Sequence, residues 1–219
     1  MSAMAARLPH GLYLITPDTP DTERLVAAVE AVLPAAPVLL QFRNKGLSGD
    51  ARLAQAGQLR ISCRAAGVPF IVNDDIELAL ALDADGVHLG RDDGDLAAAR
   101  ARLGPGRQLG VSCYNEWPRA VAAVRAGADY VAFGAVYPSP SKPAAVAADH
   151  TLLRRARTEL DVAVVAIGGI TLDNAPALVR AGATQLAVIS DVFDAPDPRR
   201  RAEAYGQLYA AGAPSTLTV

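Results

Sequence analysis

Eight short runs of apolar residues alternate with longer segments of helical periodicity along almost the whole chain of 219 residues. Most of these runs are continuously apolar, which is typical of parallel strands that are covered on both faces. The alternation therefore restricts the chain to α/β folds built around a parallel sheet. The runs span residues 12–15, 38–42, 69–72, 86–89, 108–111, 130–133, 163–167 and 185–189.

The segments between the runs carry Ala, Leu and Arg at a spacing of three to four residues, which indicates helices. Three of these segments end in a glycine just ahead of the next apolar run, and that pattern is a C-cap signal. The glycines are Gly67, Gly127 and Gly182, and Ser48 and Asn115 stand where N-caps are expected. The predicted helices span 21–33, 48–66, 76–82, 95–103, 115–126, 149–159, 173–181 and 198–211.

Eight strand and helix units in a chain of this length predict a single-domain (β/α)8 TIM barrel. The domain covers residues 1–219, with the barrel at about 11–211 and a loose tail at 212–219. An open doubly wound sheet is the competing architecture, and it would favour a glycine-rich turn after the first strand. Thr16, Pro17 and Asp18 follow that strand instead, so the barrel is favoured.

The overall composition limits the classes of partner. The formal net charge of −2 gives no reason to expect a nucleic acid or an anionic membrane. Cys63 and Cys113 form no CxxC or metal-ligand pattern, so we expect buried thiols in a reducing compartment. The longest apolar run, 162–170, is far shorter than the roughly 20 residues of a spanning helix. We therefore expect a cytoplasmic, soluble protein.

Active sites of (β/α)8 barrels lie at the carboxyl ends of the strands, so the residues that follow each run are candidates for function. The segment 134–143 is an unusually long connection, and its two hydroxyls, its prolines and its lysine favour phosphate binding. The candidates at the strand ends are Gln41, Arg43, Lys45, Asn73, Asp74, Arg91, Asp92, Asp93, Ser112, Ser139, Ser141, Lys142, Gly168, Gly169, Ser190 and Asp191.

Lysine occurs only at Lys45 and Lys142, although lysine and arginine together number 21. The chain uses arginine at nearly every basic position, so these two compact ammonium groups just beyond apolar runs suggest a specific role. Gln41, Arg43 and Lys45 alternate, and they point to the same side if the strand continues through Lys45. Two cations and an amide at a barrel mouth suit a polyanion.

Asp74 and Asp93 would come from adjacent strands, close enough to share Mg²⁺, which takes a few carboxylates together with phosphate oxygens and water. Each aspartate could instead cap a helix or face solvent, but the neighbouring cations favour the metal. Gly168, Gly169 and Ser190 match the place where many barrels bind a phosphate through backbone N–H groups.

His88 lies within the fourth run, where it is either a satisfied interior residue or a catalytic one. No Ser/His/Asp or Cys/His nucleophilic arrangement and no zinc-ligand spacing emerges from the sequence.

Several ordered motifs between about residues 12 and 190 form a recognisable set. They are QFRNK at 41–45, ND at 73–74, GVHLGRDD at 86–93, GVS at 110–112, FG at 133–134 with PSPSK at 138–142, AIGGI at 166–170 and VIS at 188–190. Together they resemble the motifs of the thiamine-phosphate synthase family.

The resemblance implies a transferase of thiamine biosynthesis. It would join 4-amino-2-methyl-5-pyrimidinylmethyl diphosphate to 4-methyl-5-(2-phosphoethyl)thiazole, or to its 2-carboxy form, and release pyrophosphate. Gln41, Arg43, Lys45, Asn73 and Lys142 would hold the pyrimidine diphosphate, with Phe42 and Asn44 in the same binding motif, and Ser112 would lie beside the pyrimidine or the departing pyrophosphate. Ser139, Pro140, Ser141, Gly169, Ile189 and Ser190 would hold the thiazole phosphate, Asp74 and Asp93 would hold the cofactor Mg²⁺, and Arg43, Lys45, Lys142 and Ser112 would be catalytic.

Two features depart from the family pattern. Serines stand at 139 and 141 where Thr-Pro-Thr-Lys is more common, and Arg91 stands where glutamine is usual, which would change the charge beside Asp93. A thiazole tautomerase-like isomerase of the same superfamily is one alternative, although it would not need the full set for a pyrimidine diphosphate and Mg²⁺. A non-catalytic barrel that binds a phosphorylated metabolite is another, and the sequence is compatible with a homo-oligomer.

Overall fold

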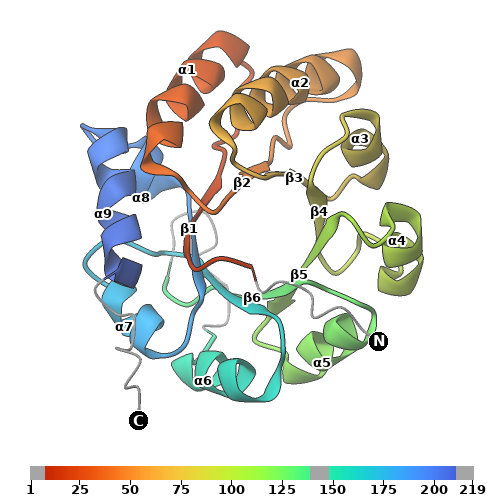
Figure 1. Cartoon of the computed structure of the whole chain (residues 1–219), viewed down its shortest axis with the longest axis vertical. Helices are drawn as coiled ribbons and strands as arrows, with labels where there is room; N and C mark the ends of the chain where they lie inside the picture. The colour runs from red at the N-terminus through yellow and green to blue at the C-terminus, as the bar shows by residue number, and fades with distance from the viewer. Residues whose placement is uncertain (1–7, 139–147, 211–219) are drawn as a thin grey trace.

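Eight parallel strands close into a barrel in which neighbours in the sequence are neighbours in space, and β1 pairs with β8 (Figure 1). The structure is a computed structural model and describes residues 8–138 and 148–210. The predicted (β/α)8 barrel is confirmed. The strands are β1 (Gly11–Ile15), β2 (Leu39–Phe42), β3 (Phe70–Asn73), β4 (Gly86–Leu89), β5 (Gln108–Tyr114), β6 (Tyr130–Gly134), β7 (Ala163–Ile167) and β8 (Gln185–Val188).

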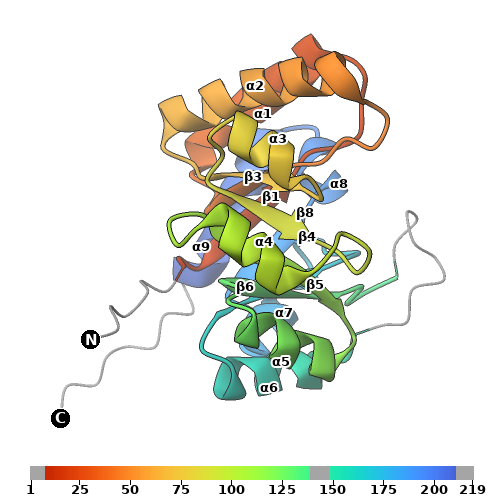
Figure 2. The same cartoon turned by 90° about the vertical axis from the view of Figure 1, so that its right-hand side faces the viewer.

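Helices surround the barrel on its outside (Figures 1 and 2). Helix α9 follows the last strand and packs against β1, α1 and η1, so it covers the place where the barrel closes. The helices are α1 (Thr22–Val32), η1 (Leu33–Ala35), α2 (Gly49–Ala66), α3 (Ile76–Ala81), α4 (Leu96–Leu103), α5 (Trp117–Arg125), α6 (His150–Glu159), α7 (Ala175–Arg180), α8 (Ser190–Phe193) and α9 (Pro198–Ala210).

Side chains along the strands alternate between two buried apolar layers. In β1, Tyr13 and Ile15 point into the barrel interior, whereas Leu12 and Leu14 pack between the strands and the helices. Because both faces are covered, the strands read as continuous apolar runs rather than as alternating ones. Burying one such side chain contributes about 1.5–3 kcal/mol, so both layers stabilise the scaffold that carries the strand ends.

The three helix-ending glycines act as predicted. Gly67, Gly127 and Gly182 have φ values of 69°, 90° and 104°, a region that favours glycine. At the start of α5 the structure differs from the prediction, since Glu116 and not Asn115 occupies the N-cap position. Ser48 does precede α2, but its side chain makes no capping hydrogen bond.

The largest differences from the predicted boundaries lie beyond β5 and β8. Strand β5 continues to Tyr114, with an irregular register between Ser112 and Tyr114 opposite β6. Arg119 of α5 holds this end, because its Nε donates to the Ser112 carbonyl and its Nη2 donates to the Gly90 carbonyl, both at 2.7 Å. Helix α8 has only four residues, too few to show a helical period in the sequence.

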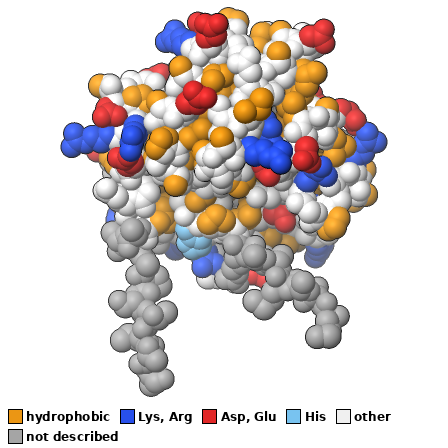
Figure 3. Space-filling model, turned by 45° about the horizontal axis from the view of Figure 1, so that its top comes forward, with side chains coloured by type: hydrophobic (Ala, Val, Ile, Leu, Met, Phe, Trp, Pro, Cys, Tyr) orange, Lys and Arg blue, Asp and Glu red, His pale blue; other side chains and the backbone are white. Residues whose placement is uncertain are grey.

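Two surface observations bear on the expected partners. Among the described residues, no helix combines the length and apolar character that crossing a membrane would require. On the face shown in Figure 3, acidic and basic side chains are interspersed rather than gathered by sign. The predicted tail at 212–219 lies outside the described residues.

Candidate active site

Side-chain contacts link residues of neighbouring strands around one half of the barrel mouth. Lys45, which follows β2, places its Nζ 3.8 Å from Asp74 Oδ2 at the end of β3. Asp93, which follows β4, lies against the Asp74 carboxyl group. Ser112 of β5 places its Oγ 2.8 Å from His88 Nε2 of β4. The structure thus brings together Lys45, Asp74 and Asp93, as expected for residues after adjacent strands, and it places Ser112 beside His88.

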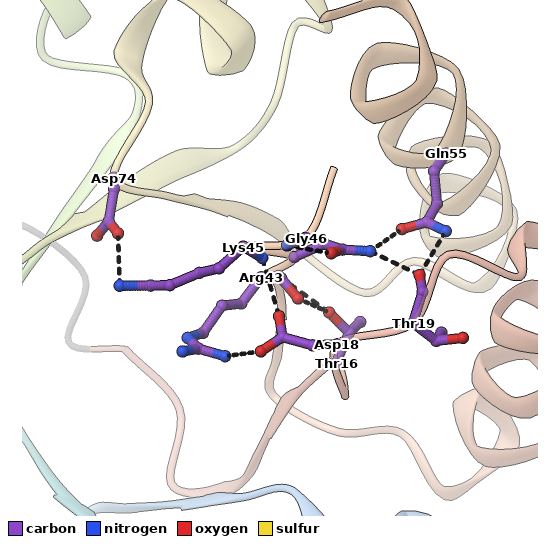
Figure 4. A network of polar contacts seen from close by, with 9 residues as sticks. Thr16, Asp18, Thr19, Arg43, Lys45, Gly46, Gln55 and Asp74 are labelled. Carbon is purple, nitrogen blue, oxygen red and sulfur yellow. Dashed lines mark hydrogen bonds and ion pairs between the residues drawn. The ribbon is translucent and has the colours of Figure 1, made fainter. Parts of the chain in front are cut away.

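The two cations after β2 share one acidic partner from the loop after β1 (Figure 4). Arg43 Nη1 donates to Asp18 Oδ2 at 2.7 Å, and the backbone N–H of Lys45 donates to Asp18 Oδ1 at 2.9 Å. Thr16 completes the link, because its Oγ1 accepts from the Arg43 N–H at 2.9 Å and donates to the Arg43 carbonyl at 3.0 Å. Asp18 and Thr16 therefore set the path of the chain that presents both cations.

Strand β2 ends at Phe42, so it does not continue through Lys45 as the alternation required. Lys45 reaches Asp74 from the loop instead, and its side chain is 63% exposed. The exposed ammonium is therefore free to rotate toward a ligand at the mouth, whereas the Arg43 guanidinium is already oriented by Asp18.

Two other members of the predicted binding motif, Phe42 and Asn44, serve the scaffold. Phe42 is fully buried between the strands and the helices, where its ring stacks on Phe70, so its side chain does not face the mouth. Asn44 is 4% exposed, and its Nδ2 donates to the Thr19 carbonyl and to Gln55 Oε1 (Figure 4). The strand alternation itself directs Phe42 away from Gln41.

Asp74 occupies an unusual position at the end of β3. Its φ is 65°, a left-handed conformation that is uncommon for residues other than glycine and is often found at functional sites. The pKa of its carboxyl group is raised from 3.8 to about 6, mainly by burial and also by the neighbouring Asp93, against the lowering effects of Lys45 and Asn73. Two carboxylates in contact repel each other unless a cation lies between them or one of them is protonated.

Helix capping does not explain Asp74 or Asp93. Asp75 caps α3 by accepting from the Leu78 N–H, and Asp95 caps α4 by accepting from the Ala98 N–H. Asp93 Oδ2 accepts from the Gly90 N–H at 2.6 Å, which holds this carboxylate within the loop after β4. The adjacent aspartates therefore do the capping and leave Asp74 and Asp93 at the mouth.

A chain of buried hydrogen bonds crosses the barrel interior beneath the mouth. Gln41 Nε2 donates to Tyr13 Oη at 2.7 Å, and Tyr13 Oη lies 2.7 Å from Tyr130 Oη. Tyr130 Oη lies 3.2 Å from His88 Nδ1, and His88 Nε2 lies 2.8 Å from Ser112 Oγ. Two predicted site residues, Gln41 and Ser112, are thus the two ends of one network.

The other half of the mouth is described only in part. The predicted residues Ser139, Pro140, Ser141 and Lys142 lie outside the described residues. The glycines after β7 approach the segment that follows β6 closely, because a Cβ on Gly169 would lie 2.5 Å from the Pro138 carbonyl oxygen. Ile189 directly follows β8, and Ser190 begins α8 with an exposed side chain.

Arg91, the departure from the family pattern, turns toward α5. Its Nη2 donates to Glu116 Oε1, and its guanidinium lies 4.8 Å from the centroid of the Tyr114 ring. The Arg91 charge is therefore paired with Glu116, and the predicted change of charge beside Asp93 is offset by that ion pair.

Sequence reasoning missed four residues that organise the mouth: Thr16, Asp18, Tyr13 and Tyr130. Asp18 carried a usable signal, since it follows the first strand and a carboxylate there faces the cations that follow the second. The tyrosines carried a weaker one, because each lies inside an apolar run where a hydroxyl needs a buried partner.

The described residues contain no group of three or more His, Cys, Asp or Glu side chains suited to a metal ion. Asp74 and Asp93 alone fit Mg²⁺, which keeps several waters and takes one or two carboxylates plus phosphate oxygens from a substrate. Together with Arg43 and Lys45 nearby, this mouth can bind a polyphosphate both directly and through a divalent cation.

Comparisons with known proteins agree with this geometry. The family described as thiamine monophosphate synthase matches residues 12–192 of the chain. A thiamine-phosphate synthase from Aromatoleum aromaticum is 67% identical over 201 residues, which cover 92% of this chain and 97% of that protein. One from Thiobacillus denitrificans is 55% identical over 205 residues, covering 93% and 96%.

A solved structure shows the same relationship in three dimensions. Thiamine phosphate pyrophosphorylase from Pyrococcus furiosus superposes with a TM-score of 0.81 at 32% sequence identity, covering 92% of this chain and 96% of that one. A KGPDC from Streptococcus mutans has a TM-score of 0.69 at 14% identity, covering 93% and 99%, which shows a shared fold alone.

Proposed function

This chain belongs to the thiamine monophosphate synthase family, and from that premise we propose how its barrel mouth works. The enzyme is a thiamine-phosphate synthase, a transferase that moves a pyrimidinylmethyl group and releases pyrophosphate. Its substrates are 4-amino-2-methyl-5-pyrimidinylmethyl diphosphate and 4-methyl-5-(2-phosphoethyl)thiazole or its 2-carboxy form. The observation that carries the proposal is the meeting of Lys45 with Asp74, and of Asp74 with Asp93, from three successive strand ends.

The diphosphate binds to the cations that follow β2. The Arg43 guanidinium is held at 2.7 Å by Asp18, so little conformational entropy is lost when it meets a phosphate. Lys45 is exposed and contacts Asp74 only at 3.8 Å, which leaves its ammonium available to a phosphate oxygen. Lys142, outside the described residues, is the third cation that we assign to this group.

Asp74 and Asp93 would hold Mg²⁺. Their contact fits a divalent cation, because the charge of Asp93 raises the pKa of Asp74 and a cation between the two would remove that repulsion. When bound, Mg²⁺ supplies charge neutralisation to the diphosphate oxygens. The protein's own contribution is to position both aspartates, Asp93 through the Gly90 N–H, which donates to its carboxylate, and Asp74 through its own backbone N–H, which donates to the His88 carbonyl at 2.9 Å.

The reaction needs no side-chain nucleophile. The carbon–oxygen bond to the diphosphate breaks as Arg43, Lys45 and Lys142 stabilise the charge that develops on the leaving group. The methylene cation that remains is delocalised into the electron-rich aminopyrimidine, and the thiazole nitrogen then donates its electron pair to that carbon. We assign the orientation of the pyrimidine to Gln41 and Asn73, which are 2% and 8% exposed.

The thiazole phosphate binds at the opposite half of the mouth. Gly169 after β7 and Ser190 at the start of α8 lie where (β/α)8 barrels often bind a phosphate. Ile189 and the hydroxyls of Ser139 and Ser141 belong to the same proposed subsite. Holding the thiazole by its phosphate keeps the ring nitrogen near the pyrimidine methylene.

The two cysteines and the bacterial relatives both bear on the location of the protein in the cell. Cys63 and Cys113 are buried free thiols, and burial raises the pKa of each to about 12, so neither is a reactive thiolate. Free thiols and relatives that are bacterial biosynthetic enzymes support a cytoplasmic location. We assign small-molecule substrates as the partners of this protein, and we assign neither a nucleic acid nor a membrane. The sequence is compatible with a homo-oligomer, and the oligomeric state is measured directly in solution.

A coupled assay tests the proposal. Purified protein is mixed with both substrates and Mg²⁺, and the release of pyrophosphate and the formation of thiamine phosphate are followed together. We expect the two products in equal amounts. Isomerisation of the thiazole without pyrophosphate release would support the tautomerase instead, and binding without turnover would support a non-catalytic barrel.

A further inference from the structure

Four successive contacts join Gln41 at one side of the mouth to Ser112 at the other through the barrel interior. The members between them are Tyr13, Tyr130 and His88, which are 1%, 0% and 6% exposed. Their neighbours in the interior layer, such as Ile71 and Val165, are apolar, and apolar layers are what usually fill such a barrel. A polar network in this place is costly unless every donor and acceptor is satisfied.

The Gln41 amide nitrogen, together with the single proton on each tyrosine, sets the direction of the network. The Gln41 amide nitrogen can only donate, so Tyr13 Oη accepts from it at 2.7 Å. The single Tyr13 proton then goes to Tyr130 Oη at 2.7 Å, and the Tyr130 proton goes to His88 Nδ1 at 3.2 Å. Both tyrosines keep their protons, since burial raises the pKa of each well above its usual range.

The same count makes His88 a neutral ring with its proton on Nε2. If Nδ1 also carried a proton, Tyr130 would have to accept from it and donate to Tyr13, whose own proton would be left without an acceptor among these groups. Burial agrees with the neutral state, because it lowers the pKa of His88 to about 4, while the charge of Asp93 opposes that shift. His88 Nε2–H therefore donates to Ser112 Oγ at 2.8 Å.

We propose that His88 is a positioning residue that makes the Ser112 hydroxyl a directed hydrogen-bond donor toward the substrate. With one lone pair of Oγ occupied by His88, the Ser112 proton points away from the ring, toward an acceptor such as a diphosphate oxygen or a pyrimidine nitrogen. The inference rests on the proposed function and deepens it, because it assigns hydrogen-bonding roles toward the substrate to Ser112 and Gln41. Gln41 presents its carbonyl oxygen in the same state, since its nitrogen is engaged by Tyr13.

The ring tautomer tests the direction of the network without any substrate. Nitrogen-15 NMR of the intact full-length protein at pH 7 distinguishes a protonated Nε2 from a protonated Nδ1. The chain has three histidines, so the His88 signals are assigned by their loss in His88→Gln. We expect the Nε2-protonated form, and a mixture of tautomers in Tyr130→Phe, in which Nδ1 loses its donor. An Nδ1-protonated ring in the intact protein would overturn the inference.

Tyr209→Phe is the matched control for the tautomer measurement. It removes a hydroxyl that donates to the Ala183 carbonyl at 3.3 Å, before β8 and away from the network. The tautomer of His88 should not change in this variant. A change equal to that in Tyr130→Phe would show that the loss of any partly buried tyrosine hydroxyl disturbs the ring.

Two substitutions separate positioning from packing in the kinetics. The amide nitrogen of His88→Gln can reach the place of Nε2 and donate to Ser112, whereas the shorter side chain of His88→Asn reaches only the place of Nδ1. We expect His88→Asn to lower kcat about tenfold with little change in KM, and His88→Gln to keep kcat within about threefold of the intact enzyme. Equal losses in the two variants would contradict positioning through Ser112.

A double-mutant cycle closes the test. If His88 acts only through Ser112, His88→Asn lowers kcat no further in a Ser112→Ala background. Independent losses that multiply would overturn the inference. If the intact protein makes no thiamine phosphate but shows the Nε2 tautomer, the proposed function fails and the direction of the network stands. If it turns over and His88→Asn is as active as the intact enzyme, the positioning role alone fails.

Discussion

At the scale of single residues, the cations at the mouth depend on an acidic partner that no motif contains. Asp18 contacts both the Arg43 side chain and the Lys45 backbone, and it is 43% exposed. An exposed ion pair contributes less than about 1 kcal/mol to stability. The contact is therefore better explained by orientation of the site than by stability of the fold.

Asp18→Ala should consequently impair binding while leaving the fold intact. We expect kcat/KM for the pyrimidine diphosphate to fall about tenfold, because Arg43 loses its orientation, and the melting temperature to change by less than about 3 °C. Steady-state kinetics and thermal unfolding measure the two effects. Glu203→Ala, which breaks the exposed Arg199–Glu203 pair on α9, is the control, and an equal loss of activity there would contradict the assignment.

Asp74 offers a prediction about pH. Its pKa is raised from 3.8 to about 6 in the folded protein, so ionising it costs more in the folded state than in the unfolded one. The penalty is absent below about pH 4, grows as the pH rises through about 6 and is complete above that value. Asp74→Asn removes it, and because the Asp74 side chain is 30% exposed we expect a gain of only about 1 kcal/mol at pH 8.

The gain from Asp74→Asn should appear in metal-free protein at pH 8, as a melting temperature higher by about 2–4 °C, and should vanish at pH 4. Asp83→Asn, at an exposed aspartate in the loop after α3, is the comparison. A stabilisation by Asp74→Asn that is the same at both pH values would show that desolvation of the carboxylate is not its cause.

Residue-level prediction from the sequence succeeded where the motif and the strand geometry agreed. Lys45, Asp74 and Asp93 meet at the mouth because each follows a buried strand that ends at the same edge of the barrel, and Ser112 near the end of β5 contacts His88. Phe42 was predicted as a binding residue only because it belongs to the motif at 41–45, although alternation within β2 turns its side chain outward. The partners of the buried tyrosines could not be predicted, because pairing across the barrel depends on register.

At the scale of elements, the segment after β6 and the segment after β7 approach each other closely. Gly169 has a φ of 62°, and a Cβ there would lie 2.5 Å from the Pro138 carbonyl oxygen and 2.8 Å from that of Tyr137. A side chain at this position would therefore strain the backbone and push the two segments apart. Gly168 and Gly169 are therefore required by the close packing of these two segments.

Gly169→Ala should thus destabilise the protein by about 1–3 kcal/mol and also raise KM for the thiazole phosphate, because the proposed phosphate subsite is displaced. Gly206→Ala provides a control of opposite sign. Gly206 is exposed within α9, and a Cβ there meets nothing within 4 Å, so the change should stabilise by about 0.5–1 kcal/mol with unchanged kinetics. Equal effects of the two changes would contradict the packing argument.

Element boundaries were predicted well where the burial pattern changes sharply. The runs at 86–89 and 163–167 coincide with β4 and β7 because polar residues or glycines follow them directly. The end of β5 was missed because Ser112 and Tyr114 read as the end of an apolar run, whereas Arg119 of α5 keeps that backbone in the sheet. Helix α8 could be found only through its tertiary contacts, such as its packing on α9.

At the scale of the whole molecule, closure of the barrel makes the site and the fold interdependent. The residues that we assign to the diphosphate and to Mg²⁺ follow β2, β3, β4 and β6. The barrel closes through the pairing of β1 with β8. A diphosphate held by Arg43, Lys45 and Mg²⁺ would bridge successive strand ends. Such a ligand binds only when the strands are in register, so it stabilises the folded barrel and not the unfolded chain.

Pyrophosphate together with Mg²⁺ should therefore raise the melting temperature, by an amount equivalent to about 2.7 kcal/mol when the two bind as a single Mg²⁺–pyrophosphate complex that is present at a hundred times its dissociation constant. In Asp74→Asn combined with Asp93→Asn, the shift with pyrophosphate alone should persist, since Arg43 and Lys45 remain, and the additional shift with Mg²⁺ should be lost. Ca²⁺ should replace Mg²⁺ poorly, because two carboxylates supply too few of the six to eight oxygens that it prefers. An undiminished Mg²⁺-dependent shift in the double variant would mean that the cation binds elsewhere, and that the contact between Asp74 and Asp93 needs another explanation.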